Sequence, residues 1–586
     1  MPCTVQRSDD QTDRIKGLSC LLSWGLRVSA LFAIVAACLT YDEVRFPASI
    51  PLKSTDVATV PLFNVWTIGW NADRAMHGLR GYWAAPIFFP AERAFAFSEP
   101  QPATLLVAPL VWVTGSAVAG YKGWLFLSLF LNGFFTALLL RRFGYAWFLQ
   151  AAGGTAMTLL PVIHQRIDVL QLVPVWGILW FWSCLFELAR NPRPRCSIET
   201  GFSFAVCFAL CVHHALFLSL LIPFAGLVFV PELKNRRFLL GTLGAVTTGV
   251  ILVLPIVLPI RAAAEANGFS REERTVKSQS AKPEQYLAAQ SNAILQWDRF
   301  EGPESRQFNV GWFRMLLAVV GATSGLLWGQ RRRWLLFLLL TGTLAMTFSL
   351  GLNLDLFGWR PWQTLSENLP GVGQVRNVYR FAWFVQMAIV LLAVEGLAAL
   401  QVICQRWFAV SFRKTALAVL VVMPGLLLAG EVWPKAAQRG GVPDVASHSG
   451  WTRFIRDNRT VGRPIVCLPF ASGNSISDFD MTTRWMCYGL EHGAPMINGY
   501  SGFFPQSYLE LRNFVNDRFP STQVVERLAK LDAEYLVVAR RYCPSDTLLA
   551  LSTKTLRVEL VYQDPVGVDV YRLVAADEAG STQAIR

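Results

Sequence analysis

The chain has 586 residues, of which 53% are hydrophobic and 16% are charged, and its mean hydropathy is +0.37. A water-soluble protein of this length needs more surface charge, so the composition excludes a soluble globular protein and indicates several membrane crossings. The net charge of +13 does not indicate nucleic-acid binding, because Lys and Arg stand in short clusters between apolar runs, where they set membrane topology. The 11 cysteines are scattered and predict no disulfide framework.

The apolar runs predict a multi-spanning helical protein. The polar N-terminus is followed by a long apolar run without a signal-peptidase cleavage pattern, so we expect a retained first span. A helix needs about 20 apolar residues to cross about 30 Å of hydrocarbon. Eleven runs meet this length loosely: about 18–40, 117–140, 145–163, 170–189, 199–213, 215–231, 238–260, 312–329, 333–351, 380–403 and 414–433.

Basic clusters predict the orientation of these spans. They fall on the side of the N-terminus with Lys16, at Arg141 and Arg142, Arg190 to Arg195, Lys234 to Arg237, Arg331 to Arg333, and Arg406 to Lys414. The positive-inside rule makes that side cytoplasmic. We therefore expect a multi-pass protein of the inner (cytoplasmic) membrane whose N-terminus is cytoplasmic and whose C-terminal domain is extracytoplasmic.

One apolar segment, residues 102–115, breaks the alternation if it is counted as a span. It is short, contains Pro109, and is not followed by a comparable basic cluster. We expect a helix that lies along the outer face or is half inserted there. A full span is the alternative.

The C-terminal part reads as an α/β domain. Residues 463–470 and 533–539 predict buried strands, 521–531 a helix, and 556–574 a final pair of strands. The expected organisation is a membrane domain over 1–433, with a long first outer loop over 41–116, followed by an extracytoplasmic α/β domain over 434–586.

The chain contains no P-loop, dinucleotide-binding turn, zinc-protease helix or nucleophile elbow. Cys207 and Cys211 lie one helical turn apart with His213 and His214 nearby, which superficially resembles the spacing of metal ligands. Small thiols in an apolar span are the more ordinary interpretation.

The first outer loop is rich in acids, among them Asp42, Glu43, Asp56, Asp73 and Glu99. From residue 57, apolar residues recur with helical spacing, which predicts an amphipathic helix on the outer face. Asp56 would stand at or near its N-terminus. An acid there is a good helix cap, worth about 1 kcal/mol, and in a partly dehydrated cleft it is also a candidate general base.

Several segments of this sequence resemble the GT-C class of membrane glycosyltransferases, and within it the bacterial branch related to mannosyl- and aminoarabinose-transferases. They are "TDVATVPLFNVWTIGW", "FFPAERAFAFSEPQP", "PVIHQRIDVLQLVPVW", "LPGVGQVRNVYRFAWF" and "LEHGAPMINGYSGFFPQSYLELRNF". The resemblance implies transfer of a sugar from a polyprenyl-phosphate carrier to a glycan, lipid or protein acceptor on the outer side. The carrier would lie among the membrane lipids.

The resemblance also implies roles for particular residues. A carboxylate of the first outer loop acts in that class as the base that deprotonates the acceptor, and Asp56 matches it best. Asp42 and Glu43, which look like the acid pair of protein mannosyltransferases, are the alternatives.

The expected substrate-binding residues are spread over three loops. Arg376 and Arg380 are expected to meet the phosphate. The others are Glu99 in the first loop and three residues of the turn between the third and fourth spans, His164, Arg166 and Asp168. For all of these, interface anchoring or helix termination is the alternative interpretation. No second acid motif accompanies the first, so a divalent metal is possible but cannot be inferred.

Two other classes of function stay open: a transporter or flippase of a lipid-linked saccharide, and a membrane scaffold without catalytic activity. Transporters place ionisable residues near the membrane midplane and often contain internal repeats. This chain has few acids in its spans and no visible repeat. That distribution favours chemistry at the membrane surface.

Overall fold

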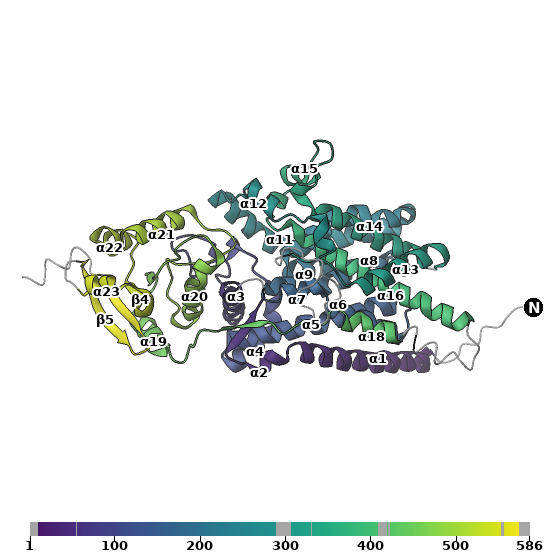
Figure 1. The fold of residues 1–586 in the computed structure, drawn as a ribbon, viewed down its shortest axis with the longest axis horizontal. Coiled ribbons are helices and arrows are strands. Elements are labelled where there is room, and N and C mark those ends of the chain that lie inside the picture. The colour runs from purple at the N-terminus through teal and green to yellow at the C-terminus, as the bar shows by residue number, and fades with distance from the viewer. Residues whose placement is uncertain are drawn as a thin grey trace, which may run out of the picture.

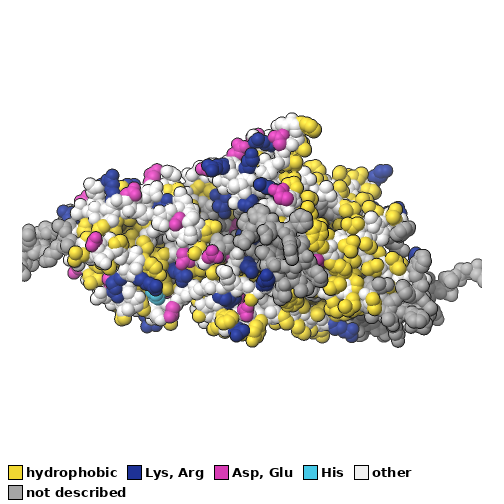
Figure 2. All heavy atoms as spheres, viewed as in Figure 1, with side chains coloured by type: hydrophobic (Ala, Val, Ile, Leu, Met, Phe, Trp, Pro, Cys, Tyr) yellow, Lys and Arg dark blue, Asp and Glu magenta, His cyan; other side chains and the backbone are white. Residues whose placement is uncertain are grey.

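The computed structural model describes residues 10–53, 56–288, 306–329, 331–407, 419, 422–552 and 556–573. The protein is elongated and mostly helical (Figure 1). A helical bundle, with α1 (Asp10–Leu39) along one edge, forms the larger part of the protein at one end of its long axis. A small sheet and its helices form the other end of that axis. Hydrophobic side chains cover much of the bundle's visible surface, whereas charged ones gather over the sheet-containing end and over α12 (Glu273–Ser278) and α15 (Pro361–Asn368) (Figure 2).

Six segments are long and apolar enough to cross a membrane. They are Leu22–Leu39, Ala117–Arg142, Leu170–Arg190, Val212–Lys234, Arg236–Asn267 and Val378–Arg406. Four more predicted spans correspond to helices that fall short of the same criterion, namely α6 (Trp147–Thr158), α9 (Pro194–Leu210), α13 (Trp312–Trp328) and α14 (Arg332–Ser349). The last predicted span lies largely outside the described residues. The count of eleven therefore stays a prediction, while a polytopic helical membrane domain is confirmed.

Glycines let two helices of the bundle approach closely. Helices α13 and α16 (Ala382–Trp407) cross where a Cβ on Gly321 would lie 2.0 Å from the carbonyl oxygen of Leu392. A Cβ on Gly396 would lie 2.2 Å from the carbonyl oxygen of Leu317. Small residues at such contacts are typical of helix pairs in membranes, where packing replaces the hydrophobic effect as the driving force.

The apolar segment 102–115 forms a 3-10 turn, η2 (Pro102–Val107), and the short helix α4 (Ala108–Thr114). These elements pack on α3 (Thr59–Met76) and α5 (Ala117–Arg142) and end at Gly115, which adopts φ 64°. They are too short to count among the spanning helices, which agrees with the expectation.

Helix α3 is buried around its whole circumference, so the predicted amphipathic surface helix is wrong. Every residue from Pro61 to Ala72 is buried. One side of α3 packs on α20 (Asp480–His492) of the C-terminal part, and the others pack on α4 and α5. Most of the enclosed side chains are apolar, and the buried amides of Asn64 and Asn71 donate hydrogen bonds. Helix α3 thus joins the two parts of the protein.

The C-terminal part is an α/β unit, as expected. Its sheet has the order β3 (Ile465–Leu468), β4 (Tyr535–Ala539), β6 (Val568–Leu573), β5 (Val558–Asp564). Strands β3 and β4 are parallel, and the other pairs are antiparallel. The helices are α19 (Ser449–Asn458), α20, α21 (Gln506–Arg518), α22 (Thr522–Ala529) and α23 (Ser545–Leu551). The domain boundary near residue 434 stays a prediction.

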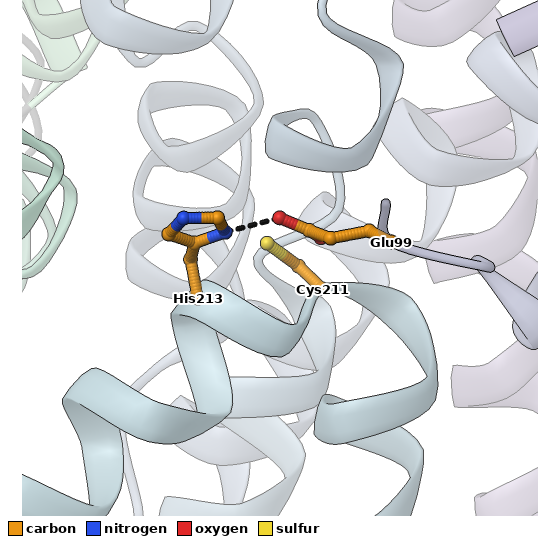
Figure 3. A group of neighbouring side chains, drawn as sticks. All are labelled: Glu99, Cys211 and His213. Atoms are coloured by element: carbon orange, nitrogen blue, oxygen red, sulfur yellow. Dashed lines mark hydrogen bonds and ion pairs between the residues drawn. The ribbon is translucent and has the colours of Figure 1, made fainter. Parts of the chain in front are cut away.

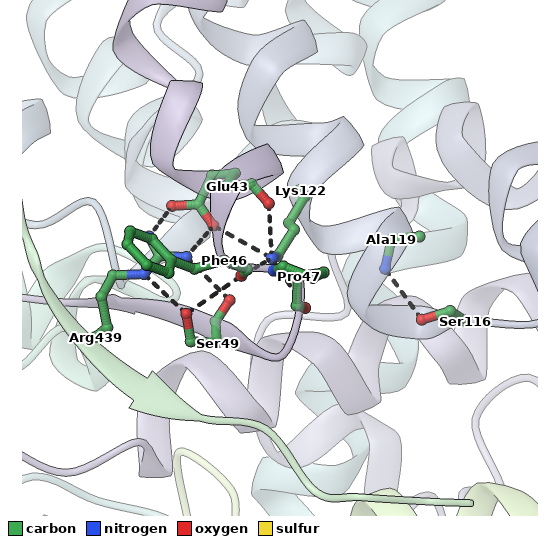
Figure 4. Close-up of polar contacts among 8 residues, drawn as sticks. All are labelled: Glu43, Phe46, Pro47, Ser49, Ser116, Ala119, Lys122 and Arg439. Carbon is green, nitrogen blue, oxygen red and sulfur yellow. Dashed lines mark hydrogen bonds and ion pairs between the residues drawn. The ribbon is translucent and has the colours of Figure 1, made fainter.

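An ion-pair cluster fastens the chain that leads into this unit. Strand β1 (Ser49–Leu52) pairs with β2 (Gln438–Gly441) in antiparallel fashion. Just before β1, Glu43 contacts both terminal nitrogens of Arg439 and lies 3.9 Å from Lys122 (Figure 4). Lys122 also donates to the backbone carbonyl of Phe46 at 2.8 Å. We call Glu43, Lys122 and Arg439 the Glu43 clamp.

Candidate functional site

A cavity of about 190 Å³ lies where the first predicted outer loop, the start of α10 (Val212–Ala225) and the end of α11 (Arg236–Asn267) meet residues of the C-terminal part. Its charged or ionisable lining residues are Glu99, His213, Arg271, Arg376 and Arg380. Its apolar lining residues include Leu216, Ile260 and Ala264, from the two apolar helices. The structure thus brings together three of the predicted substrate-binding residues, Glu99, Arg376 and Arg380.

Local structure fixes the carboxylate of Glu99. It follows the 3-10 turn η1 (Ala94–Phe97), whose four side chains are buried. Cys211 is extended between α9 and α10, which leaves the backbone N–H of Val212 free to donate to Glu99 Oε2 at 3.3 Å. The ring Nδ1 of His213 contacts the other carboxylate oxygen (Figure 3). The carboxylate of Glu99 is therefore held by two groups at the start of α10, the backbone N–H of Val212 and the ring of His213.

The charge state of Glu99 follows from these contacts. Burial by itself raises the pKa of a carboxyl group, but His213 and then Arg380 outweigh burial and lower the pKa of Glu99 to about 2. Glu99 is therefore ionised over the whole physiological pH range. Such a group suits electrostatic binding better than proton transfer, because a general base is most effective when its pKa is near the working pH.

Positive charge exceeds negative charge in the cavity, with three guanidinium groups around one carboxylate. Arg380, from η8 (Val378–Phe381), is 7% exposed, and its Nε has no hydrogen-bond partner within the described structure. Burial and the neighbouring Arg376 lower the pKa of Arg271 to about 10, so it stays charged at neutral pH. The arrangement fits a ligand that brings its own negative charge, such as a phosphate.

Glu99, Cys211 and His213 also form the group whose donor atoms are best placed for a metal ion, within 4.8 Å of one another. A carboxylate, a thiol and an imidazole are ligands that Zn²⁺ accepts. Both oxygens of Glu99 already have partners, and three guanidinium groups surround the site. These contacts satisfy the carboxylate without a cation. Cys207, the other cysteine of the predicted spacing, is not in this group.

Asp56 lies outside the cavity. Its side chain is exposed, and it has no hydrogen bond or ion pair within the described residues. Helix α3 begins at Thr59, and the backbone N–H of Ala58 donates to Oδ1 of Asp480 at 3.2 Å. Asp56 is therefore not the cap of α3. That correction removes the ordinary explanation for an acid at this position.

The residues of the turn between the third and fourth predicted spans are not among those that line the cavity, so their role in substrate binding stays a prediction. Asp168 is fully buried and accepts the backbone N–H of Lys53 at 3.1 Å, three residues before Asp56. The ring of His164 bonds the carbonyl of Thr158 at 3.0 Å, and burial lowers the pKa of His164 to about 4. Arg166 lies 5.8 Å from the ring of Tyr379.

The two alternative acids, Asp42 and Glu43, also lie outside the cavity. Glu43 is buried, and both its oxygens are engaged in the Glu43 clamp. Asp42 is partly exposed in α2 (Tyr41–Arg45), where its carbonyl accepts the N–H of Phe46. The clamp gives Glu43 a structural role.

Two cavity residues were not expected at a site. His213 was visible in "CFALCVHH", but only as one of several possible metal ligands. Arg271 is the first residue of the charged run "REER" and has no sequence signal of its own. Both residues line the cavity because of how the helices pack, which the sequence around each residue does not indicate.

Comparisons with known proteins place the fold. No family model matches the chain, and no curated protein sequence matches it significantly. Among solved structures, two mutant R1389S classes of the arabinofuranosyltransferase AftD from Mycobacteria match 94% of this chain at 15% identity, with TM-scores of 0.51 and 0.53. ArnT from Cupriavidus metallidurans matches 95% of this chain and 99% of its own at 14% identity, with a TM-score of 0.40.

The chain covers 42% of the length of AftD, so it corresponds to less than half of that protein. The chain therefore shares its fold with the part of AftD that it matches, which agrees with the fold expected from the resemblance to membrane glycosyltransferases.

Proposed function

We propose that the protein is an integral-membrane glycosyltransferase that moves a sugar from a polyprenyl-phosphate carrier to an acceptor on the extracytoplasmic side. The observation that carries this proposal is the cavity with three guanidinium groups and one carboxylate beside the apolar residues of α10 and α11. Arginine binds phosphate oxygens through paired N–H groups. A ligand with a phosphate head and an apolar tail fits both parts of this lining.

In the proposed reaction Asp56 accepts the proton of the acceptor hydroxyl, whose oxygen attacks C1 of the sugar. The bond between C1 and the phosphate oxygen breaks, and the polyprenyl phosphate leaves with the bonding electrons. Arg271, Arg376 and Arg380 compensate the charge that develops on the phosphate. Glu99 stays ionised and serves to bind and orient.

Tyr500 connects the two halves of this proposed site. Its ring lies 5.5 Å from that of Phe63 in α3, the helix that follows Asp56. Burial raises the pKa of Tyr500, and the nearby Arg376 opposes that shift, so the hydroxyl is neutral at physiological pH. A sugar that extends from the phosphate along Tyr500 would lead toward α3 and Asp56.

The base is tested with Asp56→Asn in proteoliposomes that contain a polyprenyl-phosphate sugar, with release of polyprenyl phosphate followed by mass spectrometry. We expect a rate lower by about 10²- to 10⁴-fold, with normal insertion, because Asp56 holds no part of the fold. Asp42→Asn is the matched control and should keep its rate. Full activity of Asp56→Asn would refute the assignment of the base.

The phosphate site is tested with Arg376→Gln. The control is Arg360→Gln, at a partly exposed arginine outside the cavity that forms ion pairs with Glu273 and Asp355. We expect KM for the donor to rise only in Arg376→Gln. Deletion of the protein in its host should also remove a glycan or glycolipid. Donor that crosses the bilayer without being consumed would favour a flippase, and no change in any glycan would refute the enzyme.

A further inference from the structure

The wall of the cavity on the side of the C-terminal unit is a short irregular segment, Asn498–Phe504, which we call the strap. The side chain of Asn498 fixes its base to strand β3: Oδ1 accepts the N–H of Cys467 at 2.7 Å, and Nδ2 donates to the carbonyl of Cys467 at 2.8 Å. At its tip, Gly502 and Phe503 line the cavity. The strap therefore has an anchored base and a tip over the proposed donor site.

The tip is held against the membrane domain by few contacts. The N–H of Phe503 donates to the carbonyl of Phe97 at 3.0 Å, two residues before Glu99. The ring of Phe503 stacks on that of Phe269 with centroids 4.7 Å apart. Phe97, Phe269 and Phe503 all line the cavity.

The rest of the strap packs on the membrane domain, with Tyr500 against Phe63 and Phe504 against Phe88. Arg271 makes a further contact with the tip. Its terminal nitrogen donates to the carbonyl of Gly502 at 2.8 Å, and its guanidinium lies 3.5 Å from the ring centroid of Phe503. Its Nε is buried without a hydrogen-bond partner in the described structure. A guanidinium forms stronger, paired hydrogen bonds with an anion than with a neutral carbonyl. A phosphate in the cavity would therefore compete with the strap for Arg271.

The size of the cavity gives a second reason for the strap to move. The cavity is partly open, and its volume of about 190 Å³ is small, since ligand pockets usually measure about 300–1,000 Å³. The chain around Glu99 and His213 is packed into the bundle, while the strap is the wall that belongs to the separate C-terminal unit. Withdrawal of the tip, Gly502 and Phe503, would widen the cavity enough to admit a sugar phosphate.

We infer that the strap is a lid over the donor site and that Arg271 is its latch. The guanidinium holds the lid closed until an anion in the cavity binds it in place of the carbonyl of Gly502. The inference rests on the proposed function in so far as that anion is the phosphate of a lipid-linked sugar. In the latched state Arg271 bonds Gly502; in the open state it bonds the phosphate. Arg271 thereby acts both as a binding residue and as the link between donor binding and opening.

The latch is tested with Gly502→Cys, by measuring its rate of labelling with a water-soluble maleimide in detergent, with the protein that lacks this substitution as background. Adding Arg271→Gln should raise the labelling rate at least about fivefold, while Arg274→Gln, a nearby exposed arginine with no contact to the strap, should leave it unchanged. Polyprenyl phosphate, but not the uncharged polyprenol, should raise the rate with Arg271 intact.

A cross-link tests the lid directly. A Cβ on Gly502 would lie 3.5 Å from the Cβ of Ser98, within the range that a disulfide spans. We expect Ser98→Cys with Gly502→Cys to lose sugar transfer on oxidation and to regain it with reductant, while each single variant is indifferent to both.

The outcomes separate the lid from the proposed function. Equal transfer in the cross-linked and reduced protein, or labelling that Arg271→Gln does not change, would overturn the lid. If labelling responds to Arg271→Gln and to polyprenyl phosphate but no sugar is transferred by any form, the lid stands and the proposed glycosyl transfer fails.

Discussion

The Glu43 clamp provides a measurable test of whether this acid is structural or catalytic. The perturbations are Glu43→Gln, Arg439→Gln and the double variant. The two side chains are 8% and 19% exposed, and the ion pair joins the segment after α1 to strand β2. Removing one partner of a fully buried ion pair costs about 3–5 kcal/mol, mostly because the other charge is left uncompensated.

The expected cost here is at or below the lower end of that range. Lys122, 3.9 Å from Glu43, still compensates the carboxylate when Arg439 is replaced. Arg439 in turn keeps bonds of 3.0 Å to Oγ and to the carbonyl of Ser49 when Glu43 is replaced. We therefore expect each single variant to lose about 2–3 kcal/mol of unfolding free energy. The double variant should lose less than the sum of the two by about 1 kcal/mol or more.

The free energies are measured by unfolding in mixed micelles with increasing SDS, and sugar transfer is measured on the same preparations. Glu284→Gln, an exposed acid, controls for the loss of one negative charge. Stability and transfer should fall together in the clamp variants. Loss of transfer in Glu43→Gln at unchanged stability would refute the structural assignment and would make Glu43 the candidate base.

Three further predictions concern other parts of the chain. Gly321→Ala should lower stability by several kcal/mol, since its Cβ would lie 2.0 Å from the carbonyl of Leu392, whereas Gly25→Ala, with no heavy atom within 4 Å, should not; SDS unfolding measures both. Burial and Arg459 lower the pKa of His492 to about 3, against 6.5 for an unperturbed histidine. Between pH 3 and pH 6.5 the unfolded chain therefore binds a proton at this histidine and the folded chain does not. The contribution of His492 to the free energy of unfolding is complete above pH 6.5 and should fall by about 2 kcal/mol on going to pH 5. His492→Asn should remove this part of the pH dependence in thermal denaturation. Glu99→Gln should raise KM for the donor more than it lowers kcat, because an acid with a pKa of about 2 binds rather than transfers protons; a large fall in kcat at unchanged KM would contradict that role.

The sequence was most informative where structure is local. The strands of the C-terminal unit were predicted from short apolar runs bounded by turns, and β3, β4, β5 and β6 all form. Helix α3 was recognised as helical but assigned to the wrong environment. Its burial depends on α20, about 400 residues further along the chain, which no local periodicity reports.

The candidate site shows the same limit. Glu99, Arg376 and Arg380 were predicted by resemblance to known transferases, and the structure brings them into one cavity. Arg271 and His213 join them only because the end of α11 and the start of α10 converge there, and that convergence depends on how the helices pack. For Asp56 the structure replaces the capping interpretation with an exposed, unassigned carboxylate, and its catalytic role stays a prediction.

The burial of α3 has a consequence for how the protein is made. Roughly 400 residues separate the end of α3 from the start of α20, its partner in the C-terminal unit. At the usual speed of synthesis, about 5–20 residues per second, α3 is complete some 20–80 s before α20 exists. During that interval a helix that is buried in the folded protein lacks one of its packing partners. Assembly of the nascent chain therefore requires a temporary cover for α3, which the membrane surface or a folding factor must provide until the last quarter of the protein has been synthesised.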